Sequence, residues 1–485
     1  IWSEIYISLH FFVKIKDKSM RNIICLVFLL VCVTGKCFGQ LQPKVDERIE
    51  LTGVVFRIAG VPEYTYGVIE EYNKDIDEYF QSYSHHDLID YIIKLRNEDR
   101  LGYAAVAASI GFICIGNGKV SLNQHIPVSK LPGLGEQWRS EKVFRKYVEL
   151  LNDFYVKTNF QKFYNDHKPL YEKAETCINQ LLADFNFSWF SNFFGGDFIS
   201  PVMYVALGNG PSNYYIMDYE SKAGYSIIIG GKLNYTYETT LPMVIHEICH
   251  NYTNPLFYKY WSKMEFSANA IYDEIADDMR ENAYGNVQES LLEWLNNLFS
   301  IMYLRDNEPG LVDYIVGILR DRGFIWMPRS VQFMEYFYQN RGQYPHIDSF
   351  MPQVVDFFNY TSSDFDRIKF ETQNNHPYVR NIFPANGSNI YNGNFRDIQI
   401  SFSQPMLGSY CIDTVKDDPT ITDLPRAQIR QAYWIDDYTL SIPLDCSQIE
   451  KNKKYGLVLR GNGYATKDYV YMNNDYTIIY NTTQQ

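Results

Sequence analysis

The sequence is poor in cysteine and has no excess of basic residues, and each shortage excludes a class of protein. Its 485 residues include 8 Cys, which is too few for a disulfide scaffold, and no Cys-x-x-Cys pair is present that could build a cysteine zinc site. Lys and Arg total 44 against 57 Asp and Glu, so the formal net charge is −13. No basic cluster offers a footprint for DNA or RNA, and we therefore expect no nucleic-acid partner.

A long apolar run is also missing after the first forty residues. No later segment has the roughly 18 consecutive apolar residues that a membrane-spanning helix needs. Near the start, Met20 and Arg21 precede the apolar run 23–33, and a region that contains the small residues Gly35, Cys37 and Gly39 follows. This order is typical of a secretory signal peptide. It predicts an exported protein, periplasmic, cell-surface or secreted, with no transmembrane helix after signal cleavage, and Cys37 leaves lipid anchoring open.

The pattern of apolar and turn-forming residues changes towards the C-terminus. Helical periodicity dominates the longer first part, which also holds strand-like runs at 53–59 and 225–229. Later, turn residues separate short alternating runs at 398–402, 438–442, 455–459 and 476–480. We expect an α+β protein with an upstream extension and signal peptide at 1–39, a mostly helical domain at 41–383 and a small all-β sandwich at 384–485.

Residues 246–250 match the pattern HExxH. Histidines four residues apart lie one turn apart on the same helix face, where both imidazoles can bind one Zn²⁺. Glu247 lies about 100° round the helix from His246, so it can accept a proton from a metal-bound water instead of binding the metal. The pattern predicts His246 and His250 as zinc ligands and Glu247 as the general base.

The sequence around the motif favours a buried helix. The strand-like run at 225–229 comes before it, and Thr239 or Thr240 is placed to cap a helix whose first turn tolerates Pro242. Apolar residues flank the two histidines, which predicts a helix packed in the core with its metal-binding face toward a cleft.

Zinc needs a further protein ligand, and the sequence lacks the extension HExxHxxGxxH that would supply a third histidine. A glutamate from a later helix is the alternative, as in His₂Glu sites. Three candidates are open. Glu289 lies three residues after Asn286, the spacing of a helix cap. Glu293 is one turn further on, on the polar side of an amphipathic helix, and Glu274 shares a helix face with Asp278.

Residues 46–64, the motif together with Asn254-Pro255, and residues 283–286 resemble an uncharacterised bacterial family. The family is classed as a domain of unknown function. Its members are exported proteins that are taken to be HExxH zinc metallopeptidases. In that family an Ala-Tyr-Gly-Asn element precedes a helix of the form Glu-Ser-Leu-Val-Arg, and the match places the family glutamate on Glu293. The resemblance covers roughly residues 45–380 and departs from the pattern at Asn297, where the family has Arg.

This resemblance implies a zincin-like metallopeptidase domain that binds Zn²⁺ through His246, His250 and Glu293. The segment 384–406 is similar to bacterial Ig-like domains, which implies an Ig-like sandwich after it. We therefore expect an exported zinc-dependent metallopeptidase that hydrolyses peptide bonds with a metal-activated water and Glu247 as general base, acting on a peptide or protein substrate. The alternative is a non-catalytic surface or periplasmic binding or adhesion protein with a degenerate metal site. Association with the cell surface fits either function.

Overall fold

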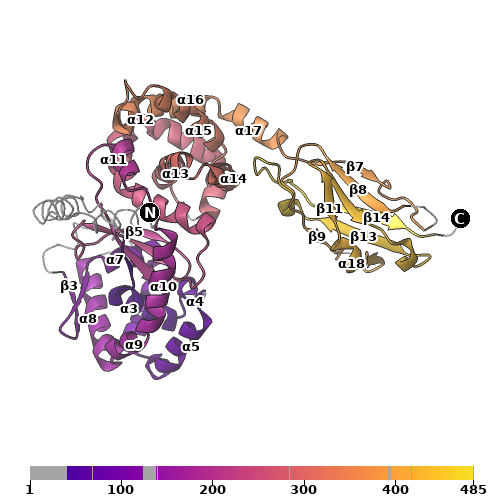
Figure 1. The fold of residues 1–485 in the computed structure, drawn as a ribbon. Coiled ribbons are helices and arrows are strands. Elements are labelled where there is room, and N and C mark those ends of the chain that lie inside the picture. The colour runs from indigo at the N-terminus through magenta and orange to yellow at the C-terminus, as the bar shows by residue number, and fades with distance from the viewer. Residues whose placement is uncertain are drawn as a thin grey trace, which may run out of the picture. The chain divides into compact units, whose positions relative to one another are not determined.

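The computed structural model of this chain describes residues 41–67, 69–123, 138, 140–282, 284–391, 395–416 and 418–483. The predicted signal peptide lies outside the described residues. The described chain forms two compact units, both traced in Figure 1: one runs to residue 192 and resumes at 196–234, and the other comprises 193–195 and everything from 235 onward. The expected mixture of helices and strands is confirmed. The domain boundary expected after residue 383 lies inside the second unit and stays a prediction.

A mixed four-stranded sheet forms the centre of the first unit, in the order β1-β4-β6-β5. β1 (Pro43–Lys44), β4 (Val202–Ala206) and β6 (Tyr225–Gly230) run parallel, whereas β5 (Tyr214–Met217) is antiparallel to β6. The strand expected at 225–229 is therefore confirmed as β6. Every residue of β6 is buried, as expected for an inner strand covered on both faces. A separate hairpin joins β2 (Ile113–Gly116) to β3 (Lys119–Leu122).

Helices make up most of the rest of the first unit. They are α3 (Glu47–Ile58), α4 (Pro62–Thr65), α5 (Glu70–Tyr79), α6 (Asp87–Asp99), α7 (Tyr103–Ile110), α8 (Glu141–Lys157), α9 (Phe160–Asp166) and α10 (Lys168–Leu181). A further helix, α11 (Ser188–Phe194), begins in the first unit and ends in the second.

The strand expected at 53–59 is wrong, because this run forms the second half of α3. Asp46 caps the helix by accepting a hydrogen bond from the backbone N–H of Arg48 at 3.0 Å. Residues 48–56 are all buried. A helix that is buried on every side has no polar face, so its continuous apolar run resembles that of a buried strand.

The HExxH motif lies on α12 (Tyr237–Glu281), the first long helix of the second unit. This helix begins before the expected caps: its N-cap is Thr236, and Thr239 and Thr240 lie inside its first turn. The predicted cap is therefore wrong. The first turn of α12 is bonded to a residue distant in sequence: the hydroxyl of Tyr237 donates a hydrogen bond to Glu308 at 2.6 Å.

The other helices of the second unit follow in order. They are α13 (Val287–Asn307), α14 (Val312–Asp321), α15 (Met327–Gln339), α16 (Ile347–Ser363) and α17 (Phe365–Asn374). α13 packs along α12. It begins as its sequence indicates: the N–H of Glu289 donates to Oδ1 of Asn286 at 2.9 Å, and Nδ2 of Asn286 donates back to the Glu289 carboxylate. The capping role expected for Glu289 is confirmed.

The second unit ends in two four-stranded sheets (Figure 1). One has the order β11-β12-β8-β7, and in the other β10, β13 and β14 are neighbours while β9 also pairs with β13. Their bounds are β7 (Val379–Phe383), β8 (Asp397–Phe402), β9 (Ile412–Asp413), β10 (Ile421–Asp423), β11 (Tyr433–Asp436), β12 (Thr439–Pro443), β13 (Lys454–Leu459) and β14 (Tyr476–Asn481), with the short α18 (Arg426–Ile429) between β10 and β11. The four strands expected from the alternating runs are present as β8, β12, β13 and β14. Both sheets contribute to one apolar core, for example Ile400 and Leu440 from one and Leu457 and Ile478 from the other.

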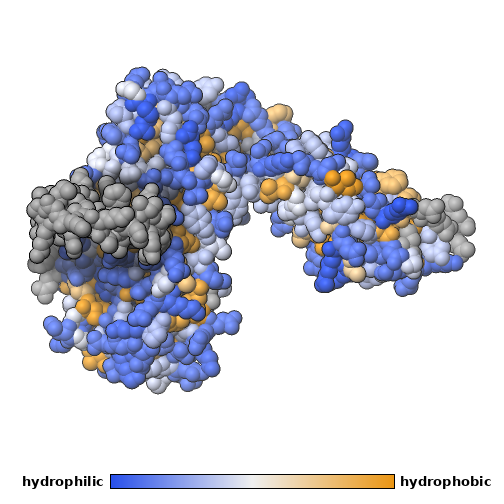
Figure 2. Space-filling view, viewed as in Figure 1, coloured by the Kyte–Doolittle hydropathy of each residue, from blue (hydrophilic) through white to orange (hydrophobic). Residues whose placement is uncertain are grey.

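The apolar character of the described chain can be followed in its helices and in the face visible in Figure 2. Within the described ranges, no helix combines the length and the apolar character needed to cross a lipid bilayer. Figure 2 shows a visible face that is mostly hydrophilic, with small separate apolar patches. Scattered apolar side chains of this kind are normal on a folded protein.

Candidate metal centre

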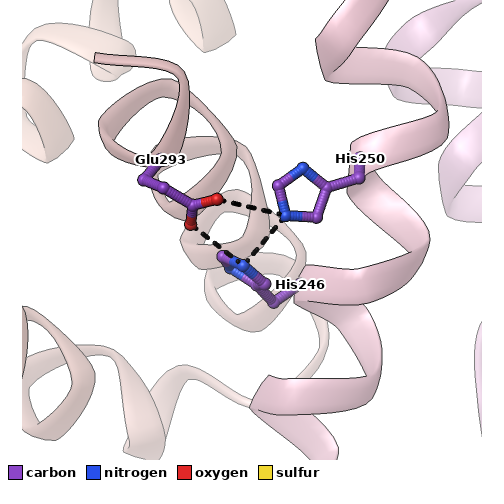
Figure 3. A group of neighbouring side chains, drawn as sticks. All are labelled: His246, His250 and Glu293. Atoms are coloured by element: carbon purple, nitrogen blue, oxygen red, sulfur yellow. Dashed lines mark hydrogen bonds and ion pairs between the residues drawn. The ribbon is translucent and has the colours of Figure 1, made fainter. Parts of the chain in front are cut away.

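His246 and His250 lie one turn apart on α12, and Glu293 reaches toward them from α13 (Figure 3). The Nε2 atoms of the two imidazoles are 3.1 Å apart. One carboxylate oxygen of Glu293 lies 3.3 Å from Nε2 of His246, and the other lies 3.5 Å from Nε2 of His250. In the described part of the chain, this is the one group of three His, Cys, Asp or Glu side chains close enough to share a metal ion.

The spacing of these atoms fits zinc. In a tetrahedral site with zinc–ligand distances of about 2.0–2.1 Å, neighbouring ligand atoms lie about 3.3 Å apart. The two Nε2 atoms lie 3.1 Å apart, and a different oxygen of Glu293 faces each of them, at 3.3 and 3.5 Å. One ligand atom from each of the three residues lies within 4.8 Å of the other two. Two imidazole nitrogens and one carboxylate oxygen also form the His₂Glu donor set of catalytic zinc sites. The donor chemistry and the distances therefore both suit this metal.

The other two glutamates considered as ligands lie elsewhere. Glu274 forms an ion pair with Lys369 of α17, and 48% of its side chain is exposed. Glu289 is engaged in capping α13 through Asn286. Of the three candidates, Glu293 alone joins the two histidines, and the structure keeps the predicted set of His246, His250 and Glu293 together.

The three groups influence one another's protonation. Burial alone would lower the pKa of His246, but the hydrogen bond and the charge of Glu293 outweigh it and raise that pKa. Burial lowers the pKa of His250, and the charge of His246 adds to this effect. Burial alone would raise the pKa of Glu293, yet the two imidazoles lower it. At neutral pH these directions favour a protonated, positively charged His246 and a neutral His250 beside an ionised carboxylate, and zinc binding would release the extra proton of His246.

Two further ionisable groups interact electrostatically with the cluster. Glu247, the predicted general base, is 8% exposed, and its charge is among the causes that raise the pKa of His246. Tyr284 follows α12, where its N–H donates to the carbonyl of Met279 at 2.8 Å. Burial raises the pKa of Tyr284, and the charges of Glu293 and Glu247 raise it further. The Glu247 carboxylate thus influences the protonation of His246, and the Glu293 carboxylate influences that of Tyr284.

Each imidazole uses its second nitrogen to bond an asparagine, a feature that the sequence reasoning missed. Nδ1 of His246 lies 3.1 Å from Oδ1 of Asn297, and Nδ1 of His250 lies 3.0 Å from Oδ1 of Asn254. Asn297 was noted only as a departure from the family pattern, and Asn254 only as part of the resemblance. The available signal was spacing, because each asparagine lies four residues after a prospective ligand and therefore on the same helix face.

One comparison with known proteins bears on this chain. A family model described as a domain of unknown function (DUF4932) matches residues 41–357, a range that contains both helices of the metal centre. No curated protein and no solved structure matches the chain. Since the matched range covers more than half of the 485 residues, the chain belongs to the DUF4932 family.

Proposed function

We propose that this protein is an exported zinc-dependent metallopeptidase with a zincin-like catalytic domain followed by an Ig-like module. The observation that carries the proposal is the set of ligand separations of 3.1, 3.3 and 3.5 Å between His246, His250 and Glu293. This set is built from an HExxH helix and a glutamate of the next helix. The combination is typical of zinc peptidases of the His₂Glu type.

Each residue of the centre has a definite role in this proposal. Nε2 of His246, Nε2 of His250 and the Glu293 carboxylate hold the zinc, which as a Lewis acid polarises a carbonyl and lowers the pKa of a water. Glu247 accepts a proton from the attacking water at its carboxylate and later donates it to the leaving amine nitrogen. The burial of Glu247 keeps this carboxylate apart from bulk water, which strengthens its interaction with developing charge.

The two finer structural assignments rest on the architecture around the centre. The HExxH helix and the nearby glutamate favour the zincin-like class. The two sheets after α17 share one apolar core, which favours a sandwich of the Ig-like kind. Export is proposed from the sequence pattern at 20–39.

A comparison of two glutamate variants tests the proposal. We expect the purified wild-type protein to contain about one zinc per chain, as a mononuclear site requires, and to hydrolyse an unstructured protein such as casein. Glu247→Gln keeps all three ligands, so it should retain the zinc while its hydrolysis falls by about 100- to 10,000-fold, the usual contribution of a general base. Zinc content and hydrolysis are measured on the same samples.

Glu274→Gln is the matched control, because Glu274 pairs with Lys369 and does not contact the two histidines. It should leave zinc content and hydrolysis unchanged. A wild-type protein that folds, binds zinc and hydrolyses no peptide bond would favour the binding or adhesion function instead. In that case Glu247→Gln would have no effect on ligand binding.

A further inference from the structure

Asn297 touches both helices of the metal centre. Its Nδ2 donates a hydrogen bond of 2.8 Å to the backbone carbonyl of Glu293, one turn earlier on α13. Its Oδ1 lies 3.1 Å from Nδ1 of His246 on α12. A single amide therefore connects the segment that carries one prospective ligand to the ring of another.

This arrangement determines which way the amide points. Amide nitrogen and oxygen are assigned from their hydrogen bonds, and only the nitrogen can donate to the Glu293 carbonyl. The oxygen is therefore the atom that faces Nδ1 of His246. An amide oxygen accepts and never donates, so Nδ1 of His246 must carry the hydrogen.

A hydrogen on Nδ1 leaves Nε2 of a neutral imidazole with a free lone pair. Nε2 of His246 is the nitrogen that faces Glu293 and His250. His250 repeats the pattern, because its Nδ1 lies 3.0 Å from Oδ1 of Asn254 and its Nε2 faces the same point. Figure 3 shows both rings presenting this nitrogen toward the Glu293 carboxylate.

We infer that Asn297 is a positioning residue of the metal centre, and that Asn254 has the same role for His250. The two amide oxygens accept the Nδ1–H of each ring and fix its orientation, so both Nε2 atoms are directed at one point, where each offers a lone pair whenever its ring is neutral. The acceptors are neutral amides, so they orient the rings without adding charge. This inference rests on the proposed zinc site.

The affinity of the protein for zinc tests the inference. It is measured on the full chain by competition with a chromophoric chelator. Asn297→Leu removes the acceptor and should weaken zinc binding by about 10- to 100-fold, the usual effect of losing a partner of a ligating histidine. Asn297→Asp keeps an acceptor oxygen but loses the donor to the Glu293 carbonyl, and it should restore most of the affinity. The d–d absorption of the Co²⁺-substituted protein should shift in the Leu variant and return toward that of the wild type in the Asp variant.

Asn307→Leu is the control. Asn307 lies on the same helix and makes the same kind of bond, from Nδ2 to the carbonyl of Tyr303 at 2.8 Å. Zinc affinity should be unchanged in this variant. If Asn297→Leu fails to fold by circular dichroism, the pair Asn254→Leu and Asn254→Asp gives the same comparison at His250.

The results separate this inference from the proposed function. Zinc binding by Asn297→Leu with the affinity of the wild type would overturn the inference and leave the peptidase proposal intact. Equal weakening in the Leu and Asp variants would also overturn it, because the donor bond within α13 would then be the part that matters. The expected affinities in a protein without hydrolysis would support the inference and remove the peptidase proposal. A wild-type protein that binds no zinc would overturn both.

Discussion

Two carboxylates, the partly buried Glu293 and the fully buried Glu50, have different neighbours and therefore different proton affinities. Glu293 lies against two imidazoles, which lower its pKa despite burial. Glu50 of α3 is completely buried and receives hydrogen bonds only from neutral groups, namely the N–H groups of Leu207 and Gly208 and the hydroxyl of Tyr72. Burial outweighs these bonds and raises the pKa of Glu50 to about 7. A charged partner, more than the number of hydrogen bonds, decides which of the two carboxylates stays ionised.

The raised pKa of Glu50 predicts a pH-dependent stability of the first unit. In the unfolded chain this carboxyl ionises near its ordinary pKa of 4.5, whereas in the folded chain it stays protonated up to about pH 7. The folded state therefore binds more protons in this window, and the free energy of unfolding falls as the pH rises through it. The total loss is about 3 kcal/mol, from 1.36 kcal/mol per unit of pKa shift.

Urea unfolding of the wild type and of Glu50→Gln at the two ends of this window measures the effect. The stability of the wild type relative to Glu50→Gln should decrease as the pH rises, because glutamine does not ionise. A difference between the two proteins that stays constant across the window would show that Glu50 has an ordinary pKa.

At the scale of single elements, the approach of α3 to the loop after β4 depends on glycine. A Cβ added to Gly53 would lie 2.4 Å from the carbonyl oxygen of Gly208, which is too close for any side chain. Alanine normally stabilises a helix interior relative to glycine by about 0.5–1 kcal/mol. Here overpacking should reverse the sign, so we expect Gly53→Ala to destabilise the protein by about 1–3 kcal/mol.

Thermal or urea unfolding checks this prediction, with Gly116→Ala as the control. A Cβ added to Gly116 would have no atom within 4 Å. The control should unfold like the wild type. Equal stability of Gly53→Ala and Gly116→Ala would mean that α3 and the loop can move apart at little cost.

The two helices of the metal centre should become more rigid when zinc binds. His246 and His250 belong to α12 and Glu293 to α13, so one cation would link the helices. Zinc at about 1,000 times its dissociation constant should stabilise the folded state by about 4 kcal/mol. Hydrogen exchange should show slower exchange in both helices on adding zinc, and no change in Glu293→Ala. Slower exchange in that variant would place the zinc elsewhere.

Local sequence signals predicted some elements and misled on others. The pair Asn286 and Glu289 identified the start of α13, because a helix cap involves only neighbouring residues. The run 53–59 was mistaken for a strand, because the apolar residues of a helix buried on all sides do not alternate with polar ones. The start of α12 was missed, because its first turn is held by Glu308, which is distant in sequence.

In the metal centre too, local spacing could be predicted from the sequence, whereas contacts between distant residues could not. The HExxH spacing follows from helix geometry, so His246 and His250 could be found from the sequence alone. Periodicity and the family resemblance together favoured Glu293 over its two rivals. The contact of Asn297 with His246 was not predicted, because it depends on how α13 packs along α12. Spacing shows which residues share a face, but packing decides which atoms meet.

At the scale of the whole molecule, Tyr469 of the two-sheet part contacts α14. A Cβ added to Gly317 of α14 would lie 2.5 Å from the Cβ of Tyr469. Arg320 of the same helix donates a hydrogen bond of 2.6 Å to the carbonyl of Tyr469. The DUF4932 match ends at residue 357, before the first strand of the two sheets. The two sheets therefore lie outside the range that the family model matches.

All residues proposed to bind zinc or transfer protons lie within the family domain. His246, Glu247, His250 and Glu293 fall within residues 41–357, as do the two asparagines that orient the imidazoles. The proposed chemistry therefore lies in the helical part of the second unit, and the two sheets have no part in it.

Titration of the chelator-treated protein with zinc, followed by peptide hydrolysis, tests the central claim most directly. The account predicts that hydrolysis is absent after chelation, returns as zinc is added and reaches its maximum at about one zinc per chain. Hydrolysis that is absent at every zinc concentration, or that is unaffected by chelation, would contradict it.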